Sequence, residues 1–182
     1  MRLKRFGIYD LVIIAVMAAL GIALKPVVTV AVHFVSAPLM IPGGSLAGGL
    51  YMMWLVLAFA LTGKCGAGTL VGAVQAVMVV LLPIPGSHGA MSLISYTAPG
   101  LALDILMFLM LVLPGRDFDR LASFFGGLVA NLVGTLIVNL IFFRLPPLFL
   151  LVTICAAALS GGIGGLIVWE LYKVAKKYRL VR

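Results

Sequence analysis

Residues 25–44 read KPVVTVAVHFVSAPLMIPGG, and the placement of this stretch decides how many times the chain crosses a membrane. The segment 27–41 within it is apolar, but at about 15 residues it is short for a full crossing. It contains His33 and is followed by a Pro-Gly-Gly turn. We therefore expect a partial or re-entrant segment here, after a first span that stops at Lys25 and the proline that follows it.

The composition of the whole chain indicates an integral membrane protein. Hydrophobic residues make up 64% of the sequence and charged residues 10%, and the mean hydropathy is +1.26. A soluble domain is nearer to roughly half apolar and a quarter charged. The 182 residues leave room for about six helices of roughly 20 residues each. We expect an all-α membrane protein in which residues 1–182 form a single domain.

Six apolar stretches are long enough to be candidate spans. They cover residues 8–24, 45–61, 67–82, 93–113, 121–143 and 148–172. Counting the segment 27–41 as a further crossing would give seven.

The basic residues favour six crossings with both termini in the cytoplasm. In that arrangement the outer face keeps only Lys25 and Arg144 of the 13 basic residues, and the other 11 lie on the cytoplasmic side. Lysine and arginine collect in cytoplasmic loops, so this distribution is the expected one. With seven crossings the loop charges and the C-terminal basic cluster cannot all share the N-terminal side.

Several other classes of protein are excluded or disfavoured. The net charge of +8 belongs to residues beside apolar spans, which does not indicate nucleic-acid binding. Cys65 and Cys155 have no CxxC spacing and no nearby histidine, so neither a metal site nor a disulfide is expected. The long apolar run after MRLKRF lacks a small-residue cleavage signature, which favours an uncleaved first span over a signal peptide.

No catalytic motif is present, and no cofactor is expected. The pair Gly63-Lys64 is followed by Cys65, and Ala58 stands where a phosphate-binding loop needs its first glycine. HExxH is absent, and neither of the two histidines lies beside an evident nucleophile. We expect a protein that is not an enzyme and has no ATPase of its own.

Polar side chains inside the spans are the first candidates for a binding site, because such groups are costly in a bilayer and usually functional. Asp104 and Gln75 lie near the middle of two spans, and Asn131 and Asn139 lie eight residues apart on one face of another. The alternative is that these side chains join neighbouring helices through hydrogen bonds worth ~0.6 kcal/mol each.

A second group of candidates lies in the turn-rich stretch PIPGSHGAMSLISYTAPG at 83–100 and in the aromatic residues of nearby spans. Tyrosine and tryptophan rings offer flat surfaces to a ring solute, although they also collect as interfacial anchors. Ser87, His88 and Ser92 offer donors and acceptors, although a solvated loop is an equally ordinary explanation. The predicted solute-binding set is His33, Tyr51, Trp54, Gln75, Ser87, His88, Ser92, Tyr96, Asp104 and Asn139.

Small residues recur at a spacing of four in three spans, and such stripes let helices approach closely. Gly126, Ala130 and Gly134 form one stripe, and Gly161 and Gly165 another, which we expect to pack inside the bundle. The stripe of Ala15, Ala19 and Ala23 in the first span could equally face another protein.

The chain resembles the substrate-binding membrane subunits (S components) of energy-coupling factor (ECF) transporters, the vitamin importers of prokaryotic cell membranes. The resemblance rests on the length, the six spans and the basic N-terminus leading into AVMAALGIA. It implies that Ala15, Ala19 and Ala23 dock on a transmembrane coupling subunit, which carries two ATPase subunits. It also implies a pocket that opens outward under the loop after the first span.

The order of GGLYMMW, TGKCGAG, PIPGSHG and PGLALD is similar to S components for thiamine or its pyrimidine precursor, and also to those for cobalamin. The function expected from the resemblance is capture of such a solute from outside for ATP-driven uptake. A self-contained secondary transporter or channel remains the alternative, although the spans contain only one central acid, Asp104. A purely structural assembly subunit is a further possibility.

Overall fold

The computed structural model describes residues 5–39, 42–82, 89–111 and 117–178. These residues form six α-helices and two short helical turns, and they contain no strand. The α-helices are α1 (Ile8–Leu39), α2 (Gly43–Thr62), α3 (Ala67–Leu81), α4 (Ser92–Leu111), α5 (Arg120–Val138) and α6 (Pro147–Lys177). A 3-10 turn, η1 (Gly89–Met91), precedes α4, and a π-helical turn, η2 (Asn139–Phe143), follows α5.

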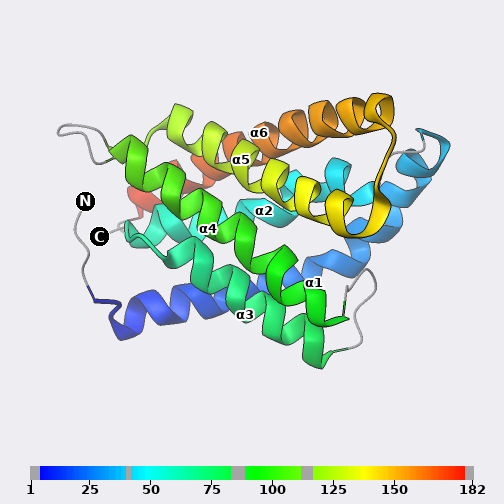
Figure 1. The fold of residues 1–182 in the computed structure, drawn as a ribbon. Helices are drawn as coiled ribbons and strands as arrows, with labels where there is room; N and C mark the ends of the chain where they lie inside the picture. The colour runs from blue at the N-terminus through cyan, green and yellow to red at the C-terminus, as the bar shows by residue number, and fades with distance from the viewer. Residues whose placement is uncertain (1–4, 40–41, 83–88, 112–116, 179–182) are drawn as a thin grey trace.

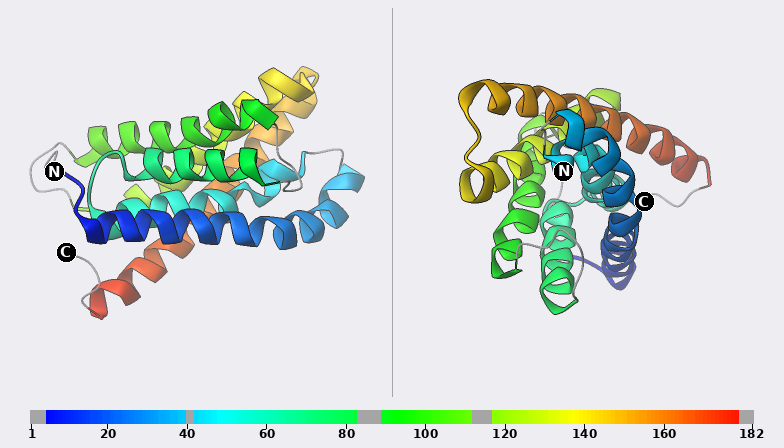
Figure 2. Two further views of the ribbon diagram at one scale, coloured as in Figure 1. Left: turned by 90° about the horizontal axis from the view of Figure 1, so that it is seen from below. Right: turned by 90° about the vertical axis from the view of Figure 1, so that its right-hand side faces the viewer.

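The segment expected to be a partial element of its own is instead the last part of α1, so that prediction was wrong. The helix continues through Pro26 and Pro38 to Leu39, and α1 curves towards its C-terminal end in Figure 2. Proline removes one backbone donor, but helices in membranes tolerate it because neighbouring groups satisfy the freed carbonyl. Lys25 and Pro26 therefore do not end the helix, and α1 is an apolar helix of 32 residues.

The helices run back and forth, so the beginning of α1 and the end of α6 lie at the same end of the bundle (Figure 1). Five of the helical stretches are long and apolar enough to cross a membrane, and α3, with 15 residues, is shorter. The helix α2 is the most buried of the five and packs against each of the other α-helices. The core therefore surrounds α2.

Glycines allow the closest helix contacts, as the stripes in the last two spans predicted. A Cβ on Gly127 would lie 2.8 Å from the backbone nitrogen of Gly165, and a Cβ on Gly161 would lie 2.8 Å from Cβ of Asn131. The predicted stripe of Gly126, Ala130 and Gly134 is also buried, but its two glycines face side chains of α2 and α4 and not α6. Because no side chain separates the backbones at Gly127 and Gly165, α5 and α6 pack tightly.

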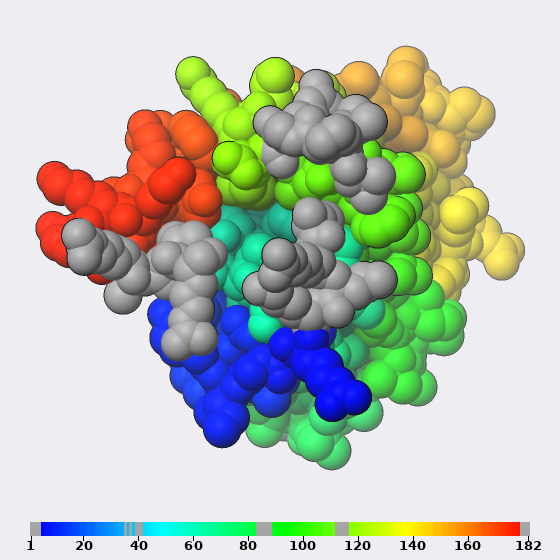
Figure 3. Space-filling view, turned by 90° about the vertical axis from the view of Figure 1, so that its left-hand side faces the viewer, coloured from blue at the N-terminus to red at the C-terminus, as the bar shows by residue number. Residues whose placement is uncertain are grey.

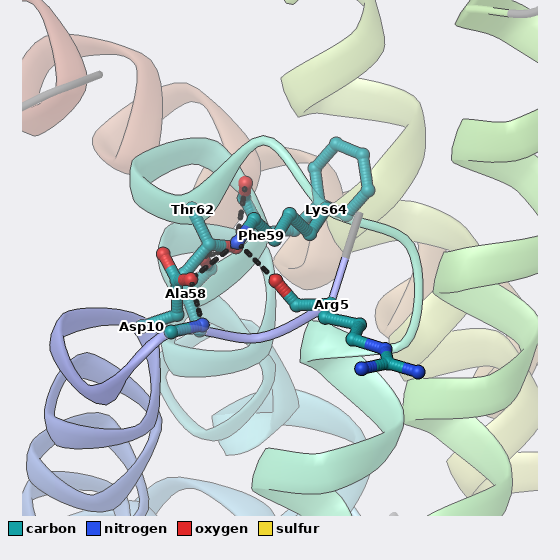
Figure 4. A network of polar contacts seen from close by, with 7 residues as sticks. Arg5, Asp10, Ala58, Phe59, Thr62 and Lys64 are labelled. Atoms are coloured by element: carbon teal, nitrogen blue, oxygen red, sulfur yellow. Dashed lines mark hydrogen bonds and ion pairs between the residues drawn. The ribbon is translucent and has the colours of Figure 1, made fainter. Parts of the chain in front are cut away.

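We call the end of the bundle that carries the beginning of α1 (blue) and the end of α6 (red) the charged end, and Figure 3 shows it face on. There Lys64, after α2, forms an ion pair with Asp10 of α1 and donates a hydrogen bond to the carbonyl of Arg5 at 2.9 Å (Figure 4). Asp119 caps α5 by accepting a hydrogen bond from the backbone of Ala122 at 2.7 Å. These contacts fix the helix ends, since capping side chains satisfy backbone groups that the helix leaves open.

Candidate solute-binding cavity

A cavity of about 300 Å³ lies in the half of the bundle opposite the charged end. It is bounded by the second half of α1, the beginnings of α2, α4 and α6, the middle of α3, and the end of α5 with η2. Its apolar wall includes Ile22, Met52, Leu55, Val138 and Phe143. The polar residues that line it are Lys25, Thr29, His33, Ser45, Tyr51, Gln75, Ser95, Tyr96, Asn131, Thr135, Asn139 and Thr153.

Lys25 and Tyr96 join α1 to α4 at the wall of the cavity. Lys25 is only 9% exposed, and its ammonium group donates a hydrogen bond to the hydroxyl of Tyr96. The same Nζ lies 4.7 Å from the centroid of the Tyr96 ring. The ammonium group therefore lies at the hydroxyl end of the Tyr96 side chain and not over the centre of its ring.

One turn further along α1, Thr29 connects two more lining residues. Its hydroxyl lies 2.9 Å from the hydroxyl of Tyr51 on α2. Its carbonyl lies 2.8 Å from Nδ1 of His33, in the next turn of the same helix. The first of these bonds ties the Tyr51 side chain to α1 at the cavity wall, where a preformed aromatic group is available to a solute.

Gln75 of α3 reaches the cavity because Gly21 of α1 has no side chain. A Cβ at Gly21 would overlap Nε2 of Gln75 and would lie 3.1 Å from Cδ1 of Trp54. Gln75 is 4% exposed. The glycine thus brings the amide and the indole ring against α1, and Gln75 offers an amide donor and acceptor.

The opposite wall is organised by Asn131 of α5. Its amide donates hydrogen bonds to the carbonyls of Ser45 on α2 at 3.1 Å and Ala157 on α6 at 2.8 Å. Further along the same face, Oδ1 of Asn139 accepts a hydrogen bond from the backbone of Leu145 at 3.1 Å. These two asparagines fix the loop after η2 and the beginnings of α2 and α6, which together close this wall.

Thr153, near the beginning of α6, differs from its neighbours. It is 1% exposed and lines the cavity, yet its hydroxyl has no hydrogen-bond partner among the described residues. Buried polar groups are nearly always hydrogen-bonded, so we expect this hydroxyl to gain a partner when a solute fills the cavity.

The structure brings together five of the predicted binding residues: His33, Tyr51, Gln75, Tyr96 and Asn139 line one cavity. Three others, Trp54, Ser92 and Asp104, are buried but do not line it. The remaining two, Ser87 and His88, lie outside the described residues.

Asp104 has a visible structural role at the start of α3. Its carboxylate accepts hydrogen bonds from the backbone nitrogens of Gly68 at 3.2 Å and Thr69 at 2.7 Å, and from the hydroxyl of Thr69 at 2.6 Å. These atoms lie towards the charged end, away from the cavity.

Sequence reasoning missed Lys25, Thr29, Ser45, Ser95, Thr135 and Thr153 as lining residues. Lys25 was interpreted as a charge at the outer end of the first span, because the following proline suggested that the helix stopped there. Thr135 carried a usable signal, since it lies four residues from both Asn131 and Asn139 and therefore on their helix face. Ser45, Ser95 and Thr153 carry no local pattern that separates them from other serines and threonines.

The cavity does not resemble a metal site. Among the described residues no three histidine, cysteine or acidic side chains come together. The cavity lining contributes one such residue, His33, and one nitrogen of its ring lies within hydrogen-bond distance of the carbonyl of Thr29. Nothing in the described lining indicates a site for a resident cofactor.

Residues 9–133 match the model of a family described as "ABC-type cobalt transport system, permease component". The match covers more than half of the chain, and the chain belongs to this family. A comparison with curated protein sequences found no match.

The fold is that of an ECF S component. A solved structure described as "Crystal structure of an S-component of ECF transporter" superposes with a TM-score of 0.74. The superposition covers 96% of this chain and 85% of that one, at 16% sequence identity. The chain is thus a membrane transport protein with the S-component fold.

Proposed function

We propose that the protein is the solute-capturing subunit of an ECF-type importer, and that its solute is a vitamin or vitamin precursor of the thiamine-pyrimidine class. The observation that carries the proposal is the cavity, which combines tyrosine rings with amide, hydroxyl and ammonium groups in the half of the bundle opposite the charged end. Ligand sites typically have such mostly apolar walls with a few placed polar groups.

The size of the cavity favours a small heterocycle over cobalamin. At about 300 Å³ it lies at the lower end of the range of ligand pockets, roughly 300–1,000 Å³. A single aromatic ring with short substituents fits this space, and a corrin macrocycle with its side chains does not.

The family description raises cobalt itself as a second candidate solute. The donor set of the cavity argues against it, because cobalt sites are built from several imidazole, thiolate or carboxylate ligands. Of the described lining residues, only His33 offers such a ligand. Hydroxyl, amide and tyrosine groups instead suit an organic ring.

The distribution of basic residues supports an orientation of the protein in the membrane, and the exposed small residues support a docking surface for the subunits that supply energy. We place the charged end in the cytoplasm, because this end carries most of the basic residues that the structure describes, namely Arg5, Lys64, Arg120, Lys173, Lys176 and Lys177. Ala15, Ala19 and Ala23 are exposed on α1, where they are available to a transmembrane coupling subunit that carries two ATPases. The solute enters from the outer side of a prokaryotic membrane, and ATP hydrolysis on partner chains drives its release inward.

A direct test is to purify the protein in mild detergent and analyse the sample in two ways. Mass spectrometry identifies any organic molecule that co-purifies, and elemental analysis measures cobalt. We expect a small heterocycle at about one molecule per chain and no stoichiometric cobalt. Stoichiometric cobalt without an organic solute would overturn the proposal, and retention of cobalamin would overturn the substrate class.

A further inference from the structure

Within this proposed function, the charges around the cavity distinguish between solutes that carry the same ring. We propose that the cavity accepts a neutral or anionic ring solute and rejects a cationic one, and that Lys25 sets this preference. The inference rests on the proposed function and adds the charge of the solute to it.

The first observation is the position of Lys25. Because α1 continues through Pro26, this residue lies within the helix, 9% exposed, with its ammonium group at the cavity wall beside Tyr96. An ammonium group has three donors and no acceptor. A solute that meets this part of the wall must therefore present an acceptor oxygen or nitrogen.

The second observation is the position of the carboxylates. The sequence contains five acidic residues, all of them lie in described segments, and none of them lines the cavity. Each of the five has another place in the structure. Asp10 forms an ion pair with Lys64, and Glu170 forms one with Lys173. Asp104 accepts hydrogen bonds at the start of α3, and Asp117 and Asp119 lie at the start of α5. A cationic solute would find no opposite charge in the cavity, which makes its desolvation costly.

The third observation concerns the aromatic ring that lies closest to the lysine. The face of an aromatic ring is the other common partner of a buried cation. In this cavity the ammonium of Lys25 already occupies the hydroxyl end of the Tyr96 side chain, 4.7 Å from the centroid of the ring. A second cation at this wall would meet a like charge in an environment of low dielectric, where repulsion is strong.

Together, these three observations predict which group of the solute faces Lys25. An oxygen of a hydroxyl, carboxylate or phosphate would receive a charge-assisted hydrogen bond from Lys25, and such bonds are roughly twice as strong as neutral ones. In the thiamine-pyrimidine class, the hydroxymethyl pyrimidine and its phosphate ester carry this group. Thiamine carries the same pyrimidine attached to a permanently cationic thiazolium ring.

The test measures equilibrium binding of three probes to the purified protein by calorimetry: the hydroxymethyl pyrimidine, its phosphate ester and thiamine. In the wild type we expect the first two to bind at least tenfold more tightly than thiamine. Lys25→Met removes the charge and keeps the length of the side chain, so it should reduce this preference to less than threefold. Lys25→Arg keeps the charge and should retain the preference, whereas Lys176→Met, on the exposed end of α6, should change nothing.

The outcomes separate the inference from the proposed function. If thiamine binds most tightly to the wild type, the inference is overturned while a thiamine-class importer stands. If the Lys25→Met variant still prefers the pyrimidine and its ester over thiamine, Lys25 does not set the preference. Failure of all three probes to bind would reject the substrate class and the inference together. The ranking in the wild type decides the charge preference even if Lys25→Met fails to fold.

Discussion

The carboxylate of Asp104 on α4 lies against the first turn of α3, where Oδ2 accepts hydrogen bonds from both the backbone nitrogen and the hydroxyl of Thr69, at 2.7 and 2.6 Å. The first nitrogens of a helix have no partner within the helix. Asp104 supplies one from a neighbouring helix. A mid-span acid, which sequence alone associates with ion coupling, thus holds two helices together here.

Asp104→Ala should destabilise the protein without reducing its affinity for the solute. Loss of the acceptor leaves the backbone donors of Gly68 and Thr69 without this partner, which we expect to cost about 1–3 kcal/mol. The measurement is thermal unfolding in detergent together with solute affinity. A large loss of affinity at unchanged stability would show that Asp104 contributes to solute binding.

Gly21→Ala should weaken solute binding by displacing Gln75. The added methyl group would overlap Nε2 of Gln75 and crowd Trp54, so the amide must leave its position at the cavity wall. We expect affinity to fall by about tenfold, a change of about 1.4 kcal/mol. The indole fluorescence should change as well.

A double-mutant cycle checks this explanation, because interacting residues give non-additive effects. In a Gln75→Ala background, Gly21→Ala should cost much less than it does alone. Fully additive losses would show that the glycine acts through something other than Gln75.

Thr153→Val should reduce solute affinity while leaving stability unchanged or slightly raised. Valine keeps the shape of the side chain and removes a hydroxyl that has no partner among the described residues. A lost hydrogen bond of about 1 kcal/mol corresponds to roughly a fivefold weaker affinity. Titration of the solute measures the first effect and thermal unfolding the second.

Thr62→Val is the matched control for this substitution. The hydroxyl of Thr62 bonds to the carbonyl of Ala58 at 2.8 Å, at the charged end. Its loss should leave affinity unchanged. If both valine variants weaken binding equally, the effect of Thr153 is not local to the cavity.

Ala19→Phe should block assembly with the energising subunits and leave solute binding intact. Ala19 is exposed on α1, and a bulky ring there would prevent the close helix approach that small residues permit. The measurement is co-purification of the coupling subunit and ATPases with the tagged variant. Ile163→Phe, at an exposed position of α6, is the control, and normal assembly of Ala19→Phe would exclude this face as the docking surface.

The helices and their packing stripes could be predicted from local sequence. Apolar runs of about 20 residues form helices in a bilayer because the backbone groups have no other partner there. The spans predicted at 45–61 and 67–82 agree closely with α2 and α3. The glycines at a spacing of four in α5 and α6 likewise pack inside the bundle, because their spacing alone places them on one helix face.

The cavity could be predicted only in part. Sequence indicated that Asn131 and Asn139 share a face of one helix, since their spacing is a local property. It did not indicate that α1 continues through Pro26, because the effect of a proline depends on what its neighbours contribute. It also did not indicate that Asp104 contacts α3, because that contact joins residues 35 positions apart in the chain.

Sequence by itself determined that this chain is a helical membrane protein, approximately where most of its helices begin and end, and which stripes let those helices pack closely. These features depend on hydropathy and spacing along the chain. Only the tertiary structure decided that Lys25 lies in the cavity beside Tyr96 while Asp104 lies outside it. The reason is that a cavity is formed by faces of several helices, and which faces meet depends on the packing of the whole bundle.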